Sequence, residues 1–405
     1  ASQASSYLPY ASSHSPYPED LWRWLEATSQ SSCADFIAIP HNSNVSKGFM
    51  FAEETLRGQP IDRAYAQSRM RWEPIVEITQ IKGDSEVHPL FAPNDEFADF
   101  ELYPFYIQQQ PEAYDPQPGD YVRSGMKTGL SIAARIGINP FEFGVVGSTD
   151  AHTGLASAEE DNFWGKMATD STPENKINPV IAGGSRGWTM SASGLAAVWA
   201  EENSRESIMA AFRRRETYAT TGPRIGVRVF GGWDFAEQDL ETNLSTAGYA
   251  KGVPMGGELT AAQPGAQPRF VVTALKDAQG ANLDRIQIIK GWIDSSGATQ
   301  ERVFDVAWSG DRELNSNGKL TAVGNTVDLQ TGRHRNTIGA PALTSLWVDE
   351  DFDPSQAAFY YVRVLQIPTA RHAHYDALAL GMDAPTVGPA VIQERAYTSP
   401  IWYKP

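Results

Sequence analysis

An α/β protein followed by an all-β part is the fold class that this sequence predicts, and three observations support it. Up to about residue 222, apolar residues alternate between helical spacing and short continuous runs. Beyond that point, β-rich runs separated by Gly, Asn, Asp and Pro follow without a strong helical pattern. The 405 residues, of which 41% are hydrophobic, are enough for two cores. We therefore predict an α/β domain over residues 1–222 and a β-rich, sandwich-like domain over residues 223–405.

Three stretches of the first half have the signals of helices. Residues 15–30 place Pro18 near the helix start and acidic residues in the first turn. Residues 121–137 carry apolar residues at helical spacing and end in a glycine. Residues 203–219 begin near Ser204, a residue type that caps helices, and contain three arginines where the helix dipole favours cations.

Short apolar runs predict the strands. In the first half these runs are residues 35–40, 73–81 and 138–147. In the second half they are residues 225–232, 269–275, 284–294, 301–308, 359–368 and 394–403. The last of them is expected to be the final strand of the β-rich domain.

Residues 153–193 form a long segment rich in Gly, Ser, Asn and Pro, with little periodicity. Segments of this length inside compact domains are uncommon and often act as lids or binding loops. We therefore expect this segment to close over a site.

Composition limits the classes of partner. The net charge of −16 argues against nucleic acid, because a phosphate backbone would be repelled over most of the surface. No apolar run approaches the roughly 18 residues that span a bilayer. The single cysteine, Cys33, excludes an intrachain disulfide and a cysteine-based zinc cluster.

Residues 1–10 lack the basic and apolar parts of a signal peptide. Localisation stays open, with a periplasmic or secreted location preferred over a cytoplasmic one.

Three polar residues follow predicted strands closely and are candidate metal ligands. His41 comes directly after the strand at 35–40, and Asp150 and His152 follow the strand at 138–147. In α/β folds, the carboxyl ends of neighbouring strands meet at one edge, where active sites form. If the chain stays extended, Asp150 and His152 lie on the same side. Mixed histidine and carboxylate ligands suit zinc, manganese or iron. The alternative is a polar turn in which Asp150 caps the next segment.

A second group of candidates lies on and after the strand at 73–81. Glu77 is flanked by apolar residues, so we expect it to be buried and partnered. The following loop brings Lys82, Asp84, Glu86 and His88. A solvated charged loop is the alternative for this group, and we prefer it for Asp84 and Glu86.

Two other stretches carry weaker patterns. The sequence GGSRGW, which contains Arg186, could cradle an anion through its backbone amides and the arginine, but it lacks the flanking strand and helix of known anion loops. His372 and His374 would share one side of an extended segment, which indicates either a metal site or a structural loop. No nucleophile elbow, nucleotide-hydrolase phosphate loop or dinucleotide fingerprint occurs.

Five long stretches together resemble a known family: FIAIPHNSNVSKGFMF, PIVEITQIKGDSEVHP, FGVVGSTDAHTG, YATTGPRIGVRVFGG and QERAYTSPIWY. The resemblance is to the bacterial proteins grouped as domain of unknown function 3604, which are similar to the polymerase-and-histidinol-phosphatase (PHP) superfamily. It implies a distorted (β/α)₇ barrel that binds two or three metal ions and hydrolyses phosphoesters. In the superfamily a late histidine and a final Asp-x-His are metal ligands, which correspond to His41, Asp150 and His152. Glu77 and His88 are further candidate ligands.

The chain also departs from the superfamily pattern. PHP-like proteins open with a His-x-His strand and further Asp-His, Glu and His ligands, and none of these precedes His41. We therefore expect the chain to be the C-terminal part of a PHP-like barrel. The remaining ligands are expected from an N-terminal fragment of the same protein, bound as a second chain.

The resulting hypothesis is a metal-dependent hydrolase of phosphate esters or related anionic esters, with Mn, Zn or Fe activating water. Lys82, Arg186 or Arg224 would neutralise the substrate. One alternative is a metal-dependent hydrolase of sulfate esters, lactones or amides. Another is a non-catalytic ligand-binding protein on a degenerate barrel.

Overall fold

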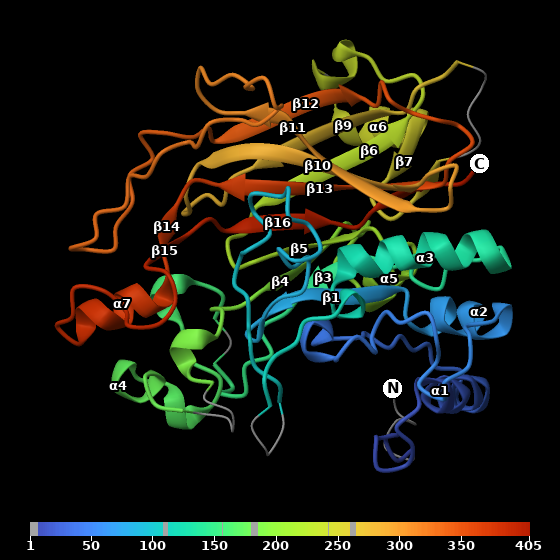
Figure 1. Cartoon of the computed structure of the whole chain (residues 1–405), viewed down its shortest axis with the longest axis horizontal. Helices are drawn as coiled ribbons and strands as arrows, with labels where there is room; N and C mark the ends of the chain where they lie inside the picture. The colour runs from blue at the N-terminus through green and yellow to red at the C-terminus, as the bar shows by residue number, and fades with distance from the viewer. Residues whose placement is uncertain (1–6, 108–111, 156, 180–184, 242, 260–264) are drawn as a thin grey trace.

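The computed structural model describes residues 7–107, 112–155, 157–179, 185–241, 243–259 and 265–405. Its sheets are stacked in layers, and the large sheet in the middle contains strands from both halves of the chain (Figure 1). A four-stranded sheet lies on one side, and a small sheet with helices lies on the other. The fold is therefore a mixed α/β arrangement of several sheets, and the strands of the described residues do not close into a barrel.

The central sheet draws strands from both halves of the sequence. Its order is β11 (Thr299–Trp308), β10 (Leu283–Ile293), β13 (Ala358–Gln366), β16 (Arg395–Thr398), β5 (Thr217–Thr220) and β4 (Leu195–Val198). The short strands β17 (Ile401–Tyr403) and β8 (Glu258–Leu259) extend it beside β13. Strands β4 and β5 precede residue 222, whereas the other strands of this sheet follow it. The sheet therefore contains strands from both sides of the domain boundary predicted at residue 222.

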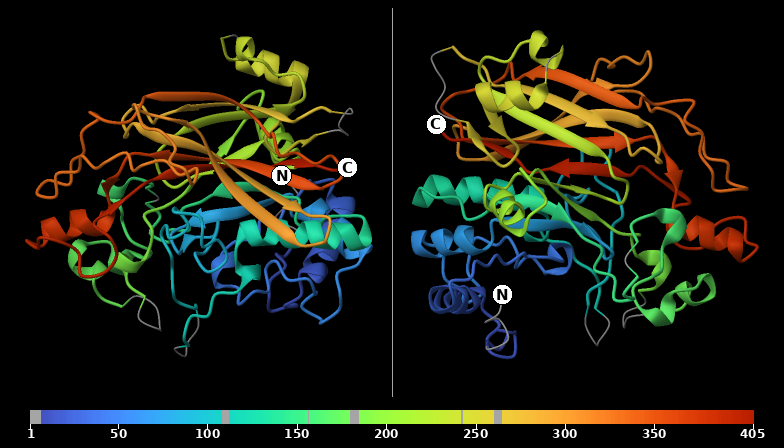
Figure 2. Two further views of the ribbon diagram at one scale, coloured as in Figure 1. Left: turned by 45° about the horizontal axis from the view of Figure 1, so that its top comes forward. Right: turned by 180° about the vertical axis from the view of Figure 1, so that it is seen from behind.

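The four-stranded sheet covers one face of the central sheet. Its order is β12 (Ala342–Val348), β9 (Arg269–Leu275), β6 (Gly226–Gly232) and β7 (Gly252–Pro254). Val229 and Val272 from this sheet share a buried core with Ile288 and Val362 from the central sheet. Figure 2 shows α6 (Leu244–Lys251) on the outer side of the four-stranded sheet. The β-rich half thus contains two sheets packed face to face, antiparallel except for the parallel pair of β17 and β8.

The other face of the central sheet packs on the first half of the chain. The small sheet has the order β2 (Gly83–Asp84), β1 (Ile75–Gln80) and β3 (Gly144–Gly147), with β1 and β3 parallel. Around it lie α1 (Pro18–Ser32), α2 (Arg63–Trp72) and α3 (Val122–Ile136). Ile78 of β1 and Met126 of α3 belong to the same buried core as Phe359 of β13.

Most predicted elements of the first half are confirmed. Helices α1 and α3 match their predictions, and α5 (Arg205–Arg213) begins after Ser204, whose side chain accepts a hydrogen bond from the Ser207 amide. The predicted strand at 35–40 is wrong. Among the described residues, two backbone hydrogen bonds join that segment to its neighbours, from Ala38 N to Trp72 O and from Glu77 N to Pro40 O.

The second half contains helices that its sequence pattern did not predict, α6 and α7 (His372–Ala379). His372 and His374 lie on α7 and not on an extended segment. Their Nε2 atoms point to different carbonyl oxygens, those of Met190 (2.7 Å) and Leu329 (2.9 Å). These two histidines therefore serve structural contacts.

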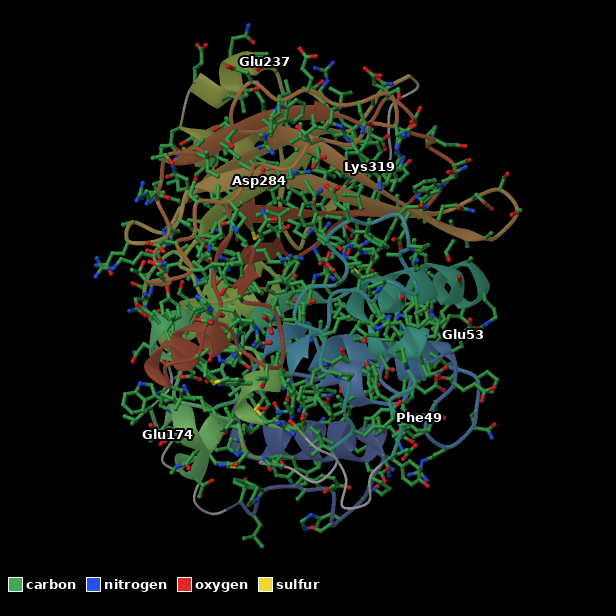
Figure 3. All side chains as sticks on the ribbon, turned by 60° about the vertical axis from the view of Figure 1, so that its left-hand side comes forward. Phe49, Glu53, Glu174, Glu237, Asp284 and Lys319 are labelled. Carbon is green, nitrogen blue, oxygen red and sulfur yellow. The ribbon has the colours of Figure 1, made fainter. Side chains whose placement is uncertain are left out.

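Residues 157–179 and 185–193 form short helices that pack against the β-rich half. One of these short helices, α4 (Pro173–Lys176), carries Glu174, which is labelled in Figure 3. Lys176 and Trp188 both contact the carboxylate of Asp376 on α7, each at 3.0 Å. Within the described residues, no helix has both the length and the apolar character needed to cross a membrane, in agreement with the sequence.

A buried ionic network connects the first half to the central sheet. Arg123 of α3 and Arg363 of β13 both contact Glu86 and Asp95, at distances of 2.6–3.2 Å. Both guanidinium groups are fully buried. The prediction that Asp84 and Glu86 are solvated is wrong, because both side chains lie in the interior. Two arginines that are distant in sequence balance the charge of Glu86 and Asp95 there.

This network gives a pH-dependent contribution to stability. Burial acts to raise the pKa of Asp95, but Arg363 and Arg123 outweigh it and hold the pKa well below its ordinary range. The stabilisation is therefore fully present above the unfolded-state pKa of about 4 and is lost as the pH falls toward the folded-state pKa. We expect the difference in unfolding free energy between the unmodified chain and Asp95→Asn to be constant above about pH 5 and smaller at pH 3. Urea unfolding at both pH values measures this; an unchanged difference at pH 3 would contradict it.

Candidate functional site

The candidate site lies where the parallel strands β1 and β3 end. Their register pairs Val76 with Val145 and Thr79 with Gly147, so both carboxyl ends reach the same edge of the small sheet. Lys82 follows β1 at that edge, and residues 148–152 follow β3. The amide of Ser148 donates to the Thr79 carbonyl at 3.1 Å and continues the pairing by one residue.

The chain after β3 turns sharply. Gly147 lies so close to the start of β4 that a Cβ atom there would come within 2.7 Å of the Leu195 carbonyl oxygen. Asp150 then has φ of +49°, in the left-handed region that is uncommon for residues other than glycine. The expectation of an extended chain through Asp150 and His152 is therefore wrong. The turn still brings the two side chains together, with His152 Nε2 3.2 Å from Asp150 Oδ1.

Two lysine ammonium groups converge on the Asp150 carboxylate. Lys82 Nζ contacts Asp150 Oδ2 directly, and Lys166 Nζ lies 2.8 Å from the same oxygen. Lys166 Nζ also lies 3.1 Å from His152 Nε2. Both lysines are 3% exposed, whereas the His152 side chain is 53% exposed. We name these four residues, Lys82, Asp150, His152 and Lys166, the lysine–aspartate site.

Lys166 was missed by the sequence analysis and is held in place by its own loop. The Asp170 carboxylate accepts hydrogen bonds from the backbone amides of Lys166 and Met167, at 3.1 and 2.5 Å. The amide of His152 donates to the Lys166 carbonyl at 2.8 Å. The segment WGKMATD does carry a lysine four residues before an aspartate, but nothing in its spacing links it to β3.

Glu77 of β1 lies beside this site and is 7% exposed. Its Oε2 atom accepts a hydrogen bond from the Ser148 hydroxyl, and the backbone of Asn42 also acts on this carboxylate. His41 is exposed, and its charge acts on Glu77, so it borders the same edge. The site thus brings together Glu77, Asp150 and His152 with His41 near them.

Burial and mutual repulsion shift the titration of these groups. Burial raises the pKa of Glu77, which the Ser148 hydrogen bond and the charge of His41 partly oppose. Burial lowers the pKa of Lys82 to about 7, and the Lys166 ammonium acts in the same direction. Burial also lowers the pKa of Lys166. The Lys166 ammonium lowers the pKa of His152.

The other predicted site residues have different surroundings. The His88 ring packs against Phe91 and Tyr121, with centroid distances of 5.9 and 5.4 Å. The Arg186 amide donates to the Thr189 hydroxyl in a short helical turn. Arg224 Nη1 lies 3.5 Å from a Glu159 carboxylate oxygen. Gly183 and Gly184 of the GGSRGW stretch lie outside the described residues.

The residues present do not by themselves fit the metal centre that the sequence predicts. A divalent cation beside Asp150 would share that space with two ammonium groups, which carry the same sign of charge. His152 Nε2 likewise faces Lys166. Across the residues that the structure describes, no group of three or more His, Cys, Asp or Glu side chains is arranged to hold a metal ion.

An apolar cavity of about 430 Å³ lies next to His41. Its walls include Leu21, Ile39 and Met50, and Phe49 at its rim is exposed (Figure 3). None of the four residues of the lysine–aspartate site lines it. This cavity offers space for an apolar group beside the polar edge.

Comparison with curated proteins and with solved structures finds no similar protein. Comparison with protein families finds a match to the family described as "Protein of unknown function (DUF3604)", over residues 1–405. The match spans both the lysine–aspartate site and the β-rich half. The chain therefore belongs to the DUF3604 family.

Proposed function

We propose that this protein hydrolyses phosphate esters or related anionic esters at the lysine–aspartate site. The observation that carries the proposal is the meeting of two buried ammonium groups, those of Lys82 and Lys166, at one carboxylate beyond the strand ends. The chain has a net charge of −16, so this positive charge is a local feature. Such a pair of cations suits a ligand with negatively charged oxygens.

Each residue of the site would have a separate role in this reaction. Lys82 and Lys166 would bind the charged oxygens and stabilise the negative charge that grows as water attacks. Asp150 would position the two ammonium groups. His152 would accept the proton that the attacking water loses. The water oxygen forms a bond to phosphorus, the ester P–O bond breaks and the alcohol leaves with a proton, so the products are phosphate and an alcohol.

A metal-bound form of the site, completed by a second chain, is a separate part of the proposal suggested by the PHP resemblance. In that form Asp150 and His152 would hold metal ions instead of contacting Lys82 and Lys166. Two or three ions of Mn, Zn or Fe would need ligands besides His41, Asp150 and His152. An N-terminal polypeptide bound to this chain would supply them and would complete a PHP-like barrel beside the sandwich-like half. Elemental analysis of the purified protein, together with a gel that shows any co-purifying polypeptide, tests both statements.

A panel of chromogenic esters tests the activity. The full chain is assayed with p-nitrophenyl phosphate, bis-p-nitrophenyl phosphate, p-nitrophenyl sulfate and p-nitrophenyl acetate, with and without added Mn²⁺. We expect the highest kcat/KM with a phosphate ester. In His152→Gln we expect kcat to fall by about 100-fold, because the proton acceptor is lost.

His14→Gln is the matched control, because His14 is exposed and stacks on Tyr10, which lines the apolar cavity and does not belong to the lysine–aspartate site. It should keep full activity. Equal activity of the two variants would contradict the role of His152. Binding of inorganic phosphate without turnover of any ester would instead identify a ligand-binding protein.

A further inference from the structure

A polar cavity of about 230 Å³, separate from the apolar cavity beside His41, lies where residues 158–161 meet the β-rich half. Glu160, Gln366 and Glu394 line it, together with Thr369 and Tyr375. Gln366 is the last residue of β13, and Glu394 directly precedes β16. The backbone N–H of Gln366 donates to the backbone carbonyl of Glu394 at 3.0 Å, so these two residues are direct neighbours.

Two buried oxygen atoms in this cavity have no hydrogen-bond donor among the described residues. Glu394 is 2% exposed; its Oε2 atom accepts a hydrogen bond from the Thr221 hydroxyl, but its Oε1 atom accepts none. Gln366 is also 2% exposed; its amide nitrogen donates to Thr369 Oγ1 at 3.2 Å, but its Oε1 atom is unpartnered. A buried oxygen without a donor is costly, so two in one cavity indicate a missing partner, either a proton donor such as water or a cation.

Glu160 brings a second carboxylate to the same place. It accepts a hydrogen bond from the His372 amide and lies beside the Glu394 carboxyl. Arg371, whose charge acts on Glu160, is bound to Glu101 through both Nε and Nη2. Arg224, which lines the cavity, pairs with Glu159. The Glu160–Glu394 pair therefore needs either a shared proton or a bound cation.

We propose that Glu160, Gln366 and Glu394 bind a divalent cation with oxygen ligands, Ca²⁺, in this cavity. Calcium takes six to eight oxygen ligands from carboxylates, amide carbonyls and water, in flexible geometry. The two carboxylates balance its charge, Gln366 Oε1 supplies a neutral ligand, and the cavity leaves room for water. The ion connects residues 158–161 to β13 and to the chain before β16, so it stabilises the contact between the two halves.

Calcium binding is measured on the unmodified full chain after treatment with a chelator. We expect isothermal titration with CaCl₂ to give one site per chain, and MgCl₂ to bind more weakly because Mg²⁺ demands near-octahedral geometry. The unfolding temperature should rise by about 3 °C at saturating Ca²⁺. Terbium should show luminescence sensitised by Tyr375, which lines the cavity. Absence of Ca²⁺ binding at millimolar concentration overturns the proposal and leaves the shared proton as the explanation.

Two variants identify the site. Glu394→Gln and Glu160→Gln should each lose the terbium signal and the calcium-dependent rise in unfolding temperature. Glu159→Gln is the matched control, because Glu159 lines the same cavity but pairs with Arg224. It should keep both signals. Calcium binding that survives in both Glu394→Gln and Glu160→Gln would place the ion elsewhere and overturn the assignment.

Discussion

Replacing Glu86 with Gln is expected to lower the free energy of unfolding by about 3–5 kcal/mol. Glu86 Oε1 lies 2.6 Å from Arg123 Nη2, and Glu86 Oε2 lies 3.0 Å from Arg363 Nη1. The Tyr361 hydroxyl donates to the same carboxylate at 2.5 Å. The substitution keeps the shape of the side chain but removes one negative charge from a buried group of two arginines and two carboxylates.

The effect is large because the arginines cannot reach water. Arg123 and Arg363 are fully buried, and only Asp95 would remain in contact with both, while Glu301 pairs with Arg123 alone. The unpaired charge carries a desolvation cost that an exposed ion pair does not have. The pKa of Glu86 is lowered for the same reason: Arg363 and Arg123 together outweigh the opposing effect of burial.

Urea unfolding of the unmodified chain and of Glu86→Gln at pH 7 measures the loss. Asp351→Asn is the matched control, because the Arg302–Asp351 pair has side chains that are 58% and 75% exposed. The control should change the free energy of unfolding by less than about 1 kcal/mol. Equal losses in the two variants would show that the network contributes no more than a surface ion pair.

The sequence allowed much of the fold to be predicted, because the signals involved are local. Pro18, Ser204 and the glycine at 137 mark helix ends, and apolar alternation marks β1, β9, β10 and β13. The layer arrangement was not predictable in this way. Strands β4 and β5 come before residue 222 but pair into the sheet of the second half, through β16 at the far end of the chain. The pairing of β5 with β16 joins residues 176–180 positions apart in the sequence.

The candidate site, like the fold, could be predicted from the sequence only where local signals mark its residues. Asp150 and His152 could be found because they follow a strand, and Lys82 because it follows the neighbouring strand. Lys166 could not, since its place depends on a turn set by Asp170 and on one backbone hydrogen bond to His152. Glu86 was misjudged for a related reason. A run of charged residues indicates a solvated loop unless distant arginines pack on it, and local sequence does not report them.

Lys166→Met is expected to lower kcat/KM for an anionic ester by about 10²–10³-fold. Met fills nearly the same space in a buried position but removes one of the two charges that face the Asp150 carboxylate. Asp150 then neutralises Lys82, so little net positive charge remains for the substrate. For the same reason, inorganic phosphate should bind at least tenfold more weakly by isothermal titration, a readout that does not depend on turnover.

Comparing a charged with a neutral ester distinguishes binding of the substrate's negative charge by Lys166 from a merely structural role of this residue. With p-nitrophenyl acetate, Lys166→Met should lose much less activity than with a phosphate ester, because the neutral ester carries no charge to bind in its ground state. Lys251→Met is the matched control, since Lys251 is partly exposed and pairs with Asp239 away from the site. Equal losses with the two esters, or unchanged phosphate binding, would mean that Lys166 only holds His152 and the 153–193 segment in position. In that case the positive charge of the lysine–aspartate site would have to act through Lys82 alone.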